Sequence, residues 1–336
     1  MSSNNNELNY LFASGHLKAK ENRLMNESAQ DKLIEATSNE DAIKILSAQG
    51  YTIGANMADK KHFYDEVMES ARIELYTQLA EIAPDIEHFN FFLYPYDYLN
   101  IKALLKGRTM DNKREIVSNA GSIPYKTVRR AVEEKSYDAL TSNMSAGITE
   151  ALEAYASKQD TQLIDIVLDK RCYADMIEAA TKSGSTFLVD YVRMLIDVTN
   201  IKTFMRLRKM HKSLNFAAYV FSAGGSISVD TFLNSYHLKL EEIAISFQGS
   251  QFSELVKEGL TLVNTAGGMG IFELKCENHI MRFVKKARYI AFGPEVVAGY
   301  ILAKETEFKN IRIIMAGKSV QLPGGKIKER LRETYA

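Results

Sequence analysis

One pattern of an acid, an asparagine, three apolar residues and a base occurs three times along this chain. Counted from the acid, its members stand at offsets 0, 3, 4, 7, 8 and 11. At 3.6 residues per turn, these offsets fall on one face of a helix. The three sets are Asp97, Asn100, Ile101, Leu104, Leu105 and Arg108; Asp197, Asn200, Ile201, Phe204, Met205 and Arg208; and Glu307, Asn310, Ile311, Ile314, Met315 and Lys318. We call the helices that carry them the signature helices, and they predict three homologous helical units.

A glycine followed two residues later by Ile or Leu gives a second repeated landmark, each time before a polar helical stretch. Glycine at such a place is typical of a turn or of a helix C-terminus. The four glycines are Gly15, Gly121, Gly225 and Gly325. The predicted organisation is three repeat units and a closing C-terminal helix, over residues 1–118, 119–222, 223–323 and 324–336.

The closing helix should pack back on the rest of the chain. Ile327, Leu331 and Tyr335 stand at steps of four residues and would share one side of a helix. Of the four glycines, Gly121, Gly225 and Gly325 mark candidate interface turns.

The apolar periodicity predicts an all-α fold. The chain has only five prolines, and long segments carry apolar residues at i, i+3, i+4 and i+7. The clearest such segments are residues 40–49, 62–83 and 187–210. The alternation of period two that indicates half-buried strands is nearly absent, and runs such as Gly225–Val229 are expected to lead into helices.

The polar members of the signature share a face with apolar residues, so they should be buried. A buried polar group is costly unless it is hydrogen-bonded, so each member needs a partner. Acid and base are 11 residues apart, roughly 16 Å along a helix, so they cannot pair with each other. Partners are therefore expected from another helix of the same unit. Two interpretations remain: buried contacts that fix helix register, which we favour, or a carboxylate site with one acid per unit.

Composition and motifs argue against several classes of protein. Lys and Arg together number 42, as do Asp and Glu, and this zero net charge does not favour binding to nucleic acid. Cys172 and Cys276 match no disulfide framework or zinc motif. The chain shows neither a secretory signal nor an apolar run long enough for a membrane span, which favours a cytoplasmic protein.

No local motif predicts catalysis. The stretch Gly317–Ser319 would need glycine at position 312 to make a phosphate loop, and Arg312 stands there. Residues 265–270, TAGGMG, are expected to form a flexible loop rather than a dinucleotide site, because no strand precedes them. The six histidines form no metal-binding pair. We therefore predict no catalytic, metal or cofactor-binding residues and no small-molecule substrate of the chain's own.

The three signature helices, with Phe292-Gly293-Pro294-Glu295 leading to the last, resemble the C subunits of archaeal and bacterial V-type (A-type) ATPases. Their eukaryotic counterpart is the d subunit of the vacuolar ATPase. The resemblance covers essentially the whole chain, with Leu207 departing from the Gly107 and Gly317 of the other two signature helices.

This resemblance implies a non-catalytic, funnel-shaped rotor adaptor with pseudo-threefold symmetry. Such an adaptor lies on the cytoplasmic face of the membrane, where it links the central shaft to the proteolipid ring. It transmits torque in ATP-coupled transport of protons or sodium ions. The sequence leaves open which ion is coupled and whether ATP is made or consumed.

Two other functions stay open at this level. One is an α-helical repeat scaffold that binds other protein partners. The other is an enzyme in which Asp97, Asp197 and Glu307 converge in one cleft, which perturbed carboxylates there would indicate.

Overall fold

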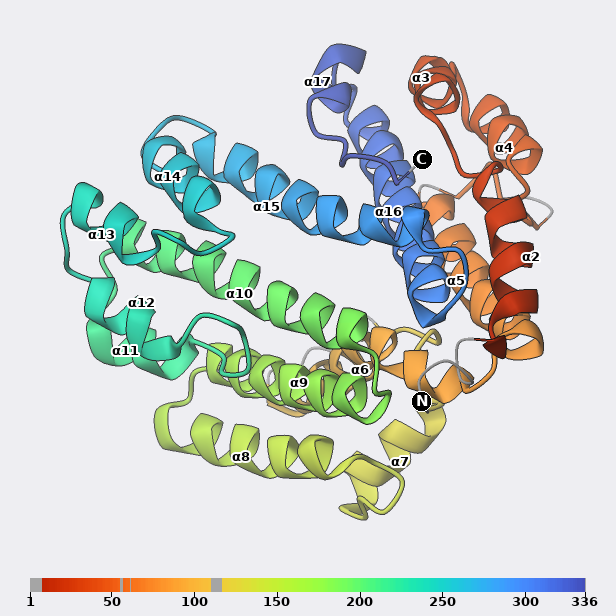
Figure 1. Cartoon of the computed structure of the whole chain (residues 1–336). Helices are drawn as coiled ribbons and strands as arrows, with labels where there is room; N and C mark the ends of the chain where they lie inside the picture. Colours follow the sequence, from red (N-terminus) through yellow and green to blue (C-terminus); the bar gives the residue numbers. More distant parts are fainter. Residues whose placement is uncertain (1–7, 55–56, 61, 110–116, 336) are drawn as a thin grey trace. The chain divides into compact units, whose positions relative to one another are not determined.

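The computed structural model describes residues 8–54, 57–60, 62–109 and 117–335, and Figure 1 shows its helices in chain order. Within these ranges every regular element is a helix, and no strand occurs. The predicted all-α fold is confirmed. The helices expected over residues 40–49, 62–83 and 187–210 are found as α4 (Asn39–Ala48), α5 (Phe63–Ile82) and α10 (Thr186–Lys209).

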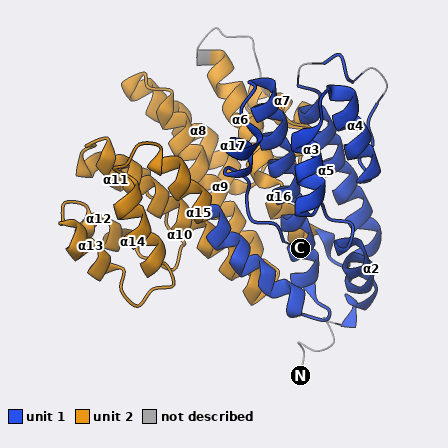
Figure 2. Cartoon of the chain, turned by 90° about the horizontal axis from the view of Figure 1, so that it is seen from above, with its two compact units in different colours: residues 1–86, 277–336 blue, residues 87–276 orange. Residues whose placement is uncertain are grey.

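Contacts between Cα atoms divide the chain into two compact units, coloured in Figure 2. Unit 1 combines both ends of the chain, Met1–Ile86 and Glu277–Ala336, and unit 2 is Glu87–Cys276. This division does not follow the predicted repeats over residues 1–118, 119–222 and 223–323, whose boundaries stay a prediction.

Unit 1 is built around one long helix, α16 (Pro294–Ser319), which packs against helices from the beginning of the chain. Pro294 stands at its first position, where a missing N–H costs nothing. Most of its apolar side chains are buried, including Ile301 and Ile311. The other helices of the unit are α2 (Leu11–Glu21), α3 (Glu27–Glu35), α4, α5, the 3-10 helix η2 (Lys285–Tyr289) and α17 (Gly324–Lys328).

Unit 2 holds the other two signature helices, α6 (Tyr94–Thr109) and α10. α9 (Gln162–Lys182) packs against both of them and against α8 (Ser142–Lys158). The remaining helices are α7 (Tyr125–Glu134), α11 (Leu214–Val220), α12 (Val229–Ser235), α13 (Leu240–Ser246) and α14 (Ser253–Leu262). Two elements cross from one unit to the other: η1 (Ile86–Phe92) and α15 (Gly268–Val284).

Three details differ from the sequence prediction. Gly15 lies inside α2 and Gly325 inside α17, rather than at turns. Gly268 already begins α15, so only the first part of TAGGMG is a loop. The closing helix stops at Lys328, although Ile327 and Tyr335 are buried as expected.

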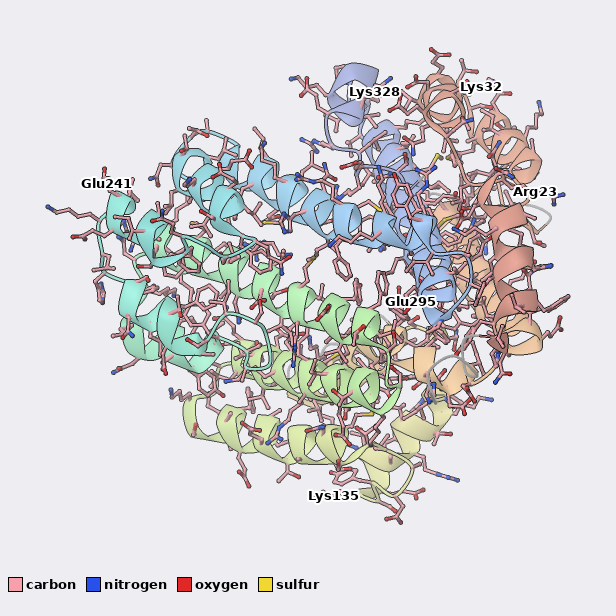
Figure 3. All side chains as sticks on the ribbon, viewed as in Figure 1. Arg23, Lys32, Lys135, Glu241, Glu295 and Lys328 are labelled. Atoms are coloured by element: carbon pink, nitrogen blue, oxygen red, sulfur yellow. The ribbon has the colours of Figure 1, made fainter. Side chains whose placement is uncertain are left out.

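Charged side chains cover the outside of the helices, as Figure 3 shows for Lys32 on α3 and Lys328 on α17. Among the described helices, none is long and apolar enough to cross a membrane.

Candidate functional site

The acid of the first signature helix fixes the loop that leads into α7. Asp97 on α6 is fully buried and accepts hydrogen bonds from the backbone N–H groups of Ser122 (3.0 Å) and Ile123 (3.1 Å). The Ser122 hydroxyl donates a third bond at 2.6 Å. Donors of this number satisfy a buried carboxylate and fix the loop against α6.

The second signature helix repeats this contact. Asp197 on α10 accepts bonds from the N–H groups of Ser226 (2.9 Å) and Ile227 (3.0 Å), and from the Ser226 hydroxyl. The sequence pattern had identified both the acids and the Gly-Ser-Ile loops. It did not reveal that each acid binds the loop that follows it.

The glycines of these loops allow the close approach of backbone and carboxylate. A Cβ atom at Gly121 would lie 2.2 Å from Asp97 Oδ1, and one at Gly225 would lie 2.1 Å from Asp197 Oδ1. Both distances are far below van der Waals contact, so neither position has room for a side chain. Gly325 is different, because a Cβ atom at that position would have no neighbour within 4 Å.

The third acid makes the corresponding contact with a segment from the beginning of the chain. Glu307 on α16 accepts a bond from the backbone N–H of Met25 at 2.7 Å. The Tyr51 hydroxyl and the Lys304 ammonium group also donate to Glu307, taking the place of the loop serine in the other two contacts.

All three acids bind the residue just before the N-cap of a helix. Ile123 precedes Pro124 of α7, Ile227 precedes Ser228 of α12, and Met25 precedes Asn26 of α3. Helices α7, α12 and α3 are therefore held in the same way by α6, α10 and α16.

Each signature asparagine pairs with both polar groups of one backbone residue. Asn100 receives the N–H of Ser118 and donates to its carbonyl, both at 2.8 Å. Asn200 binds Ser222 in the same way, at 3.0 and 2.7 Å. For the third helix, the partner lies in the C-terminal tail (residues 329–335).

The tail contact explains why the chain is not helical after Lys328. Asn310 accepts from the N–H of Arg332 at 2.8 Å and donates to its carbonyl at 2.9 Å. In a continuous helix the N–H of Arg332 would bond to the carbonyl of Lys328, so the tail leaves helical geometry to make this pair.

Two of the three signature bases bind carbonyl groups at the ends of short helices, whereas Arg108 on α6 is exposed rather than buried as expected. Arg208 donates to the carbonyls of Ser235, Tyr236 and Leu238, where α12 ends. Lys318 donates to the carbonyls of Ile34 and Ala36, where α3 ends. Cations at this position satisfy free carbonyls and interact favourably with the helix dipole. The partners of acid and base are thus backbone groups of loops and helix ends, rather than side chains of another helix of the same unit as predicted.

A buried carboxylate beside Asp97 was not found from the sequence. Asp175 on α9 accepts bonds from the hydroxyl of Tyr98 (2.7 Å), from Thr141 and from the side-chain amide of Asn143 (2.9 Å). Burial raises the pKa of Asp97 to about 6, although its three hydrogen bonds lower it. The negative charge of Asp175 raises this pKa further. Only the position of Tyr98 directly after Asp97 could have hinted at this cluster.

A second cluster attaches the tail to unit 1. Glu277 pairs with Lys309 (2.9 Å) and with Arg332 (2.8 Å). Burial alone would raise the pKa of Glu277, but the Arg332 hydrogen bond and the charges of Lys309 and Arg332 lower it to about 2. The Glu333 N–H also donates to the side chain of Asn278 at 2.9 Å.

The hydrogen bonds of the three signature acids bear on the enzyme hypothesis. The carboxylate oxygens of Asp97, Asp197 and Glu307 each accept hydrogen bonds from the separate segment that each acid binds. No group of three or more His, Cys, Asp or Glu residues within the described ranges could hold a metal ion. A cleft with three free carboxylates, which the enzyme hypothesis requires, is not formed by these contacts.

These features define a class of helical repeat protein in which buried polar residues attach each long signature helix to the start of another helix. The sequence profile of the ATP synthase (C/AC39) subunit family matches residues 13–330. The chain belongs to this family.

Named relatives align along nearly their whole length. The C subunit of the V-type sodium ATPase of Enterococcus hirae is 26% identical over 325 residues, which cover 95% of this chain and 97% of the relative. The C subunit of the A-type ATP synthase of Methanobrevibacter smithii is 23% identical over 351 residues, covering 96% and 88%. Its counterpart in the A-type ATP synthase of Methanocaldococcus jannaschii is 20% identical over 356 residues, covering 96% and 86%.

Proposed function

We propose that this chain is a non-catalytic adaptor in the central stalk of a V-type (A-type) ATPase. It links the rotating central shaft to the membrane proteolipid ring and transmits torque for ATP-coupled ion transport. It is bound peripherally, through these partners, on the cytoplasmic face of the membrane.

The family match carries this proposal. It extends over residues 13–330, and the three relatives described above align along 86% to 97% of their own length.

The signature contacts fit a part that must resist twisting. Asp97, Asp197 and Glu307 each hold the start of another helix by buried charged hydrogen bonds, which are stronger than neutral ones. Contacts of this kind stiffen the joints between helices, and torque transmission requires stiff joints.

The pseudo-threefold funnel is part of the proposal. α16 holds the residue before α3 in the way that α6 and α10 hold the residues before α7 and α12. This equivalence supports a cyclic order of three units, in which the third unit is followed by the first.

Co-purification tests the partners. We would tag the N-terminus, because Tyr335 near the other end is buried, and isolate membranes in mild detergent. Recovery of shaft subunits, proteolipid ring and nucleotide-binding subunits is the expected result, with untagged cells as the control. Recovery with none of these would reject the proposal and leave the repeat scaffold with other protein partners.

Depletion tests the adaptor role itself. A complex without this chain should still hydrolyse ATP, since the chain supplies no catalytic group, but should no longer transport ions. Adding the purified chain back should restore coupled transport. Loss of ATP hydrolysis that returns with the chain alone would contradict a non-catalytic role.

A further inference from the structure

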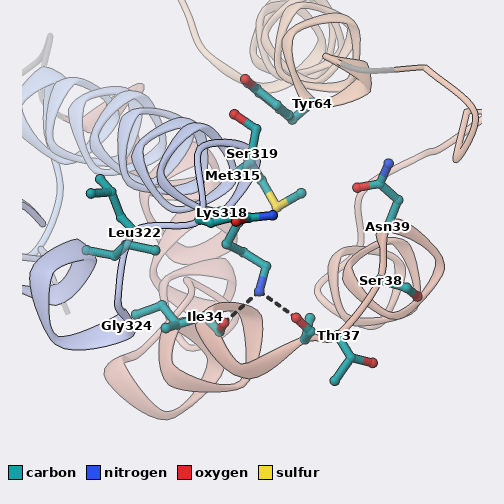
Figure 4. Close-up of a pocket in the computed structure, with 13 residues that line it drawn as sticks. Ile34, Thr37, Ser38, Asn39, Tyr64, Met315, Lys318, Ser319, Leu322 and Gly324 are labelled. Atoms are coloured by element: carbon teal, nitrogen blue, oxygen red, sulfur yellow. Dashed lines mark hydrogen bonds between the residues drawn. The ribbon is translucent and has the colours of Figure 1, made fainter.

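Two cavities occur at corresponding places, each at the C-terminal end of a signature helix. The cavity in unit 1 has a volume of about 330 Å³ and lies where α16 meets α3, α4 and α17. Figure 4 shows Lys318 reaching across it toward the end of α3, with Thr37, Asn39 and Tyr64 around it. The cavity in unit 2 has a volume of about 190 Å³ and lies at the end of α10, with Leu240 and Asn264 in its wall.

The two cavities use the same positions of the signature. At offsets 8, 11, 12 and 14 from the acid, both are lined by a methionine, the signature base and two polar residues. The last position has a left-handed backbone in both cases, with φ of 57° and 53°. The lining residues are Met315, Lys318, Ser319 and Gln321 in unit 1, and Met205, Arg208, Lys209 and His211 in unit 2.

The charge of each base is not balanced by an acid. The hydrogen bonds of Lys318 and Arg208 go to backbone carbonyls, Arg208 also lies over the Phe204 ring, and within the described ranges neither base forms an ion pair. Among the described residues, no Asp or Glu lines either cavity. Burial lowers the pKa of both bases, and no carboxylate raises either one.

Both bases keep donors that the protein does not use. An ammonium group has three N–H donors and Lys318 uses two, while a guanidinium group has five and Arg208 makes three bonds. Partly buried cations with free donors favour an anionic partner, because its charge compensates their lost hydration. The methionine and leucine side chains of the walls would contact the methylene groups of such a partner.

We propose that each of these two cavities binds an acidic side chain of a partner protein in the ATPase. This inference rests on the proposed function for the existence of that partner, and on charge complementarity for its chemistry. The corresponding cavity of the first signature helix would need residues 110–116, which lie outside the described part of the chain.

Isosteric substitutions test the proposal within the assembled complex. Gln321→Glu and Asn264→Asp each place a carboxylate beside the base without changing side-chain shape, and both positions are exposed. The internal acid then competes with the partner's acid. We expect the affinity of the chain for membranes stripped of it to fall about tenfold for each substitution.

A matched control separates this effect from net charge. Lys32→Gln with Lys135→Gln makes the same total change in charge at exposed positions outside both cavities, and should bind like wild type. If the cavity double variant binds like that control, with unchanged salt dependence, the inference is overturned while the proposed function stands.

The isolated chain gives a second test that needs no partner. Glutarate, which resembles a glutamate side chain, should cause saturable NMR shifts of the Ser319 and Lys209 backbone amides, and Gln321→Glu with Asn264→Asp should abolish them. Saturation by inorganic phosphate but not glutarate would assign the cavities to a free anion and reject the proposal, as would no saturation by either. This experiment shows whether the cavities bind carboxylates, even if co-purification rejects the ATPase assignment.

Discussion

At the scale of single residues, the length of the acidic side chain determines how close the bound segment must come. Asp97 and Asp197 are short, so the backbone of Gly121 and Gly225 lies against their carboxylates. Glu307 has one more methylene group and reaches the Met25 N–H without a glycine beside it. This difference explains why a glycine landmark predicted for the first segment, at Gly15, was wrong.

Alanine at Gly121 or Gly225 should therefore destabilise the protein by about 2 kcal/mol or more, because the new methyl group displaces a buried carboxylate from its donors. Urea denaturation followed by circular dichroism measures this. Gly325→Ala is the matched control, since its position is open and helical, and should change stability little. Equal effects at the three glycines would show that the carboxylate contact is not the cause.

Asn200→Leu should lower the free energy of unfolding by about 2–4 kcal/mol, because it leaves the buried N–H and carbonyl of Ser222 without partners. Asn200→Asp can accept from the N–H but cannot donate to the carbonyl, so it should not restore stability. Thermal melting measures both variants. An unchanged melting temperature for Asn200→Leu would contradict the role given to the signature asparagines.

At the scale of whole helices, periodicity was enough to predict the long elements and their buried faces. The limits of α5 and α10 agree with the prediction within a residue or two. The partners of the signature were not predictable in the same way. They are loop backbones and helix ends, and backbone groups carry no sequence pattern. The tail was predicted as helix because Ile327, Leu331 and Tyr335 are spaced four residues apart. Its pairing with Asn310, which takes it out of helical geometry, leaves no such spacing in the sequence.

The contact between Glu277 and the tail should make the free energy of unfolding depend on pH. The folded pKa of Glu277, about 2, lies below its ordinary value of 4.5, so its contribution is present above pH 4.5 and is lost as the pH falls toward 2. Glu277→Gln should lower stability by about 2 kcal/mol at pH 7 and by much less at pH 3. Urea denaturation at the two pH values measures the difference.

Glu254→Gln provides the control for that experiment. Its pair with Lys257 is exposed on α14, so the substitution should change stability by no more than about 0.5 kcal/mol at either pH. A Glu277 effect that is independent of pH would indicate lost packing rather than a lost charged contact.

At the scale of the molecule, the two units differ in how they are assembled from the chain. Unit 2 is one continuous segment, whereas unit 1 combines the first helices with α16 and the tail. Unit 1 therefore needs the end of the chain for its core. Tyr335 in the tail is buried, and its hydroxyl would lie 2.9 Å from a Cβ at Gly299 on α16.

Tyr335→Ala should therefore loosen unit 1 selectively, at a cost of about 3 kcal/mol for the lost aromatic packing. Hydrogen exchange should become faster in α2 and α16 and stay at its wild-type rate in α8 and α9. Met144→Ala, at a fully buried position of α8, should give the opposite pattern. Uniform acceleration in both variants would mean that the units do not open separately.

The joining of both chain ends in unit 1 also sets the order in which a ribosome can complete the protein. Unit 2 leaves the ribosome as one piece and can fold during translation, but α2 and α5 must wait for α16, which is made near the end. A product whose translation stops before Arg332 leaves Asn310 and Glu277 without their tail partners. We expect such a chain to expose its unfinished surfaces to chaperones and proteases, which would remove it before assembly.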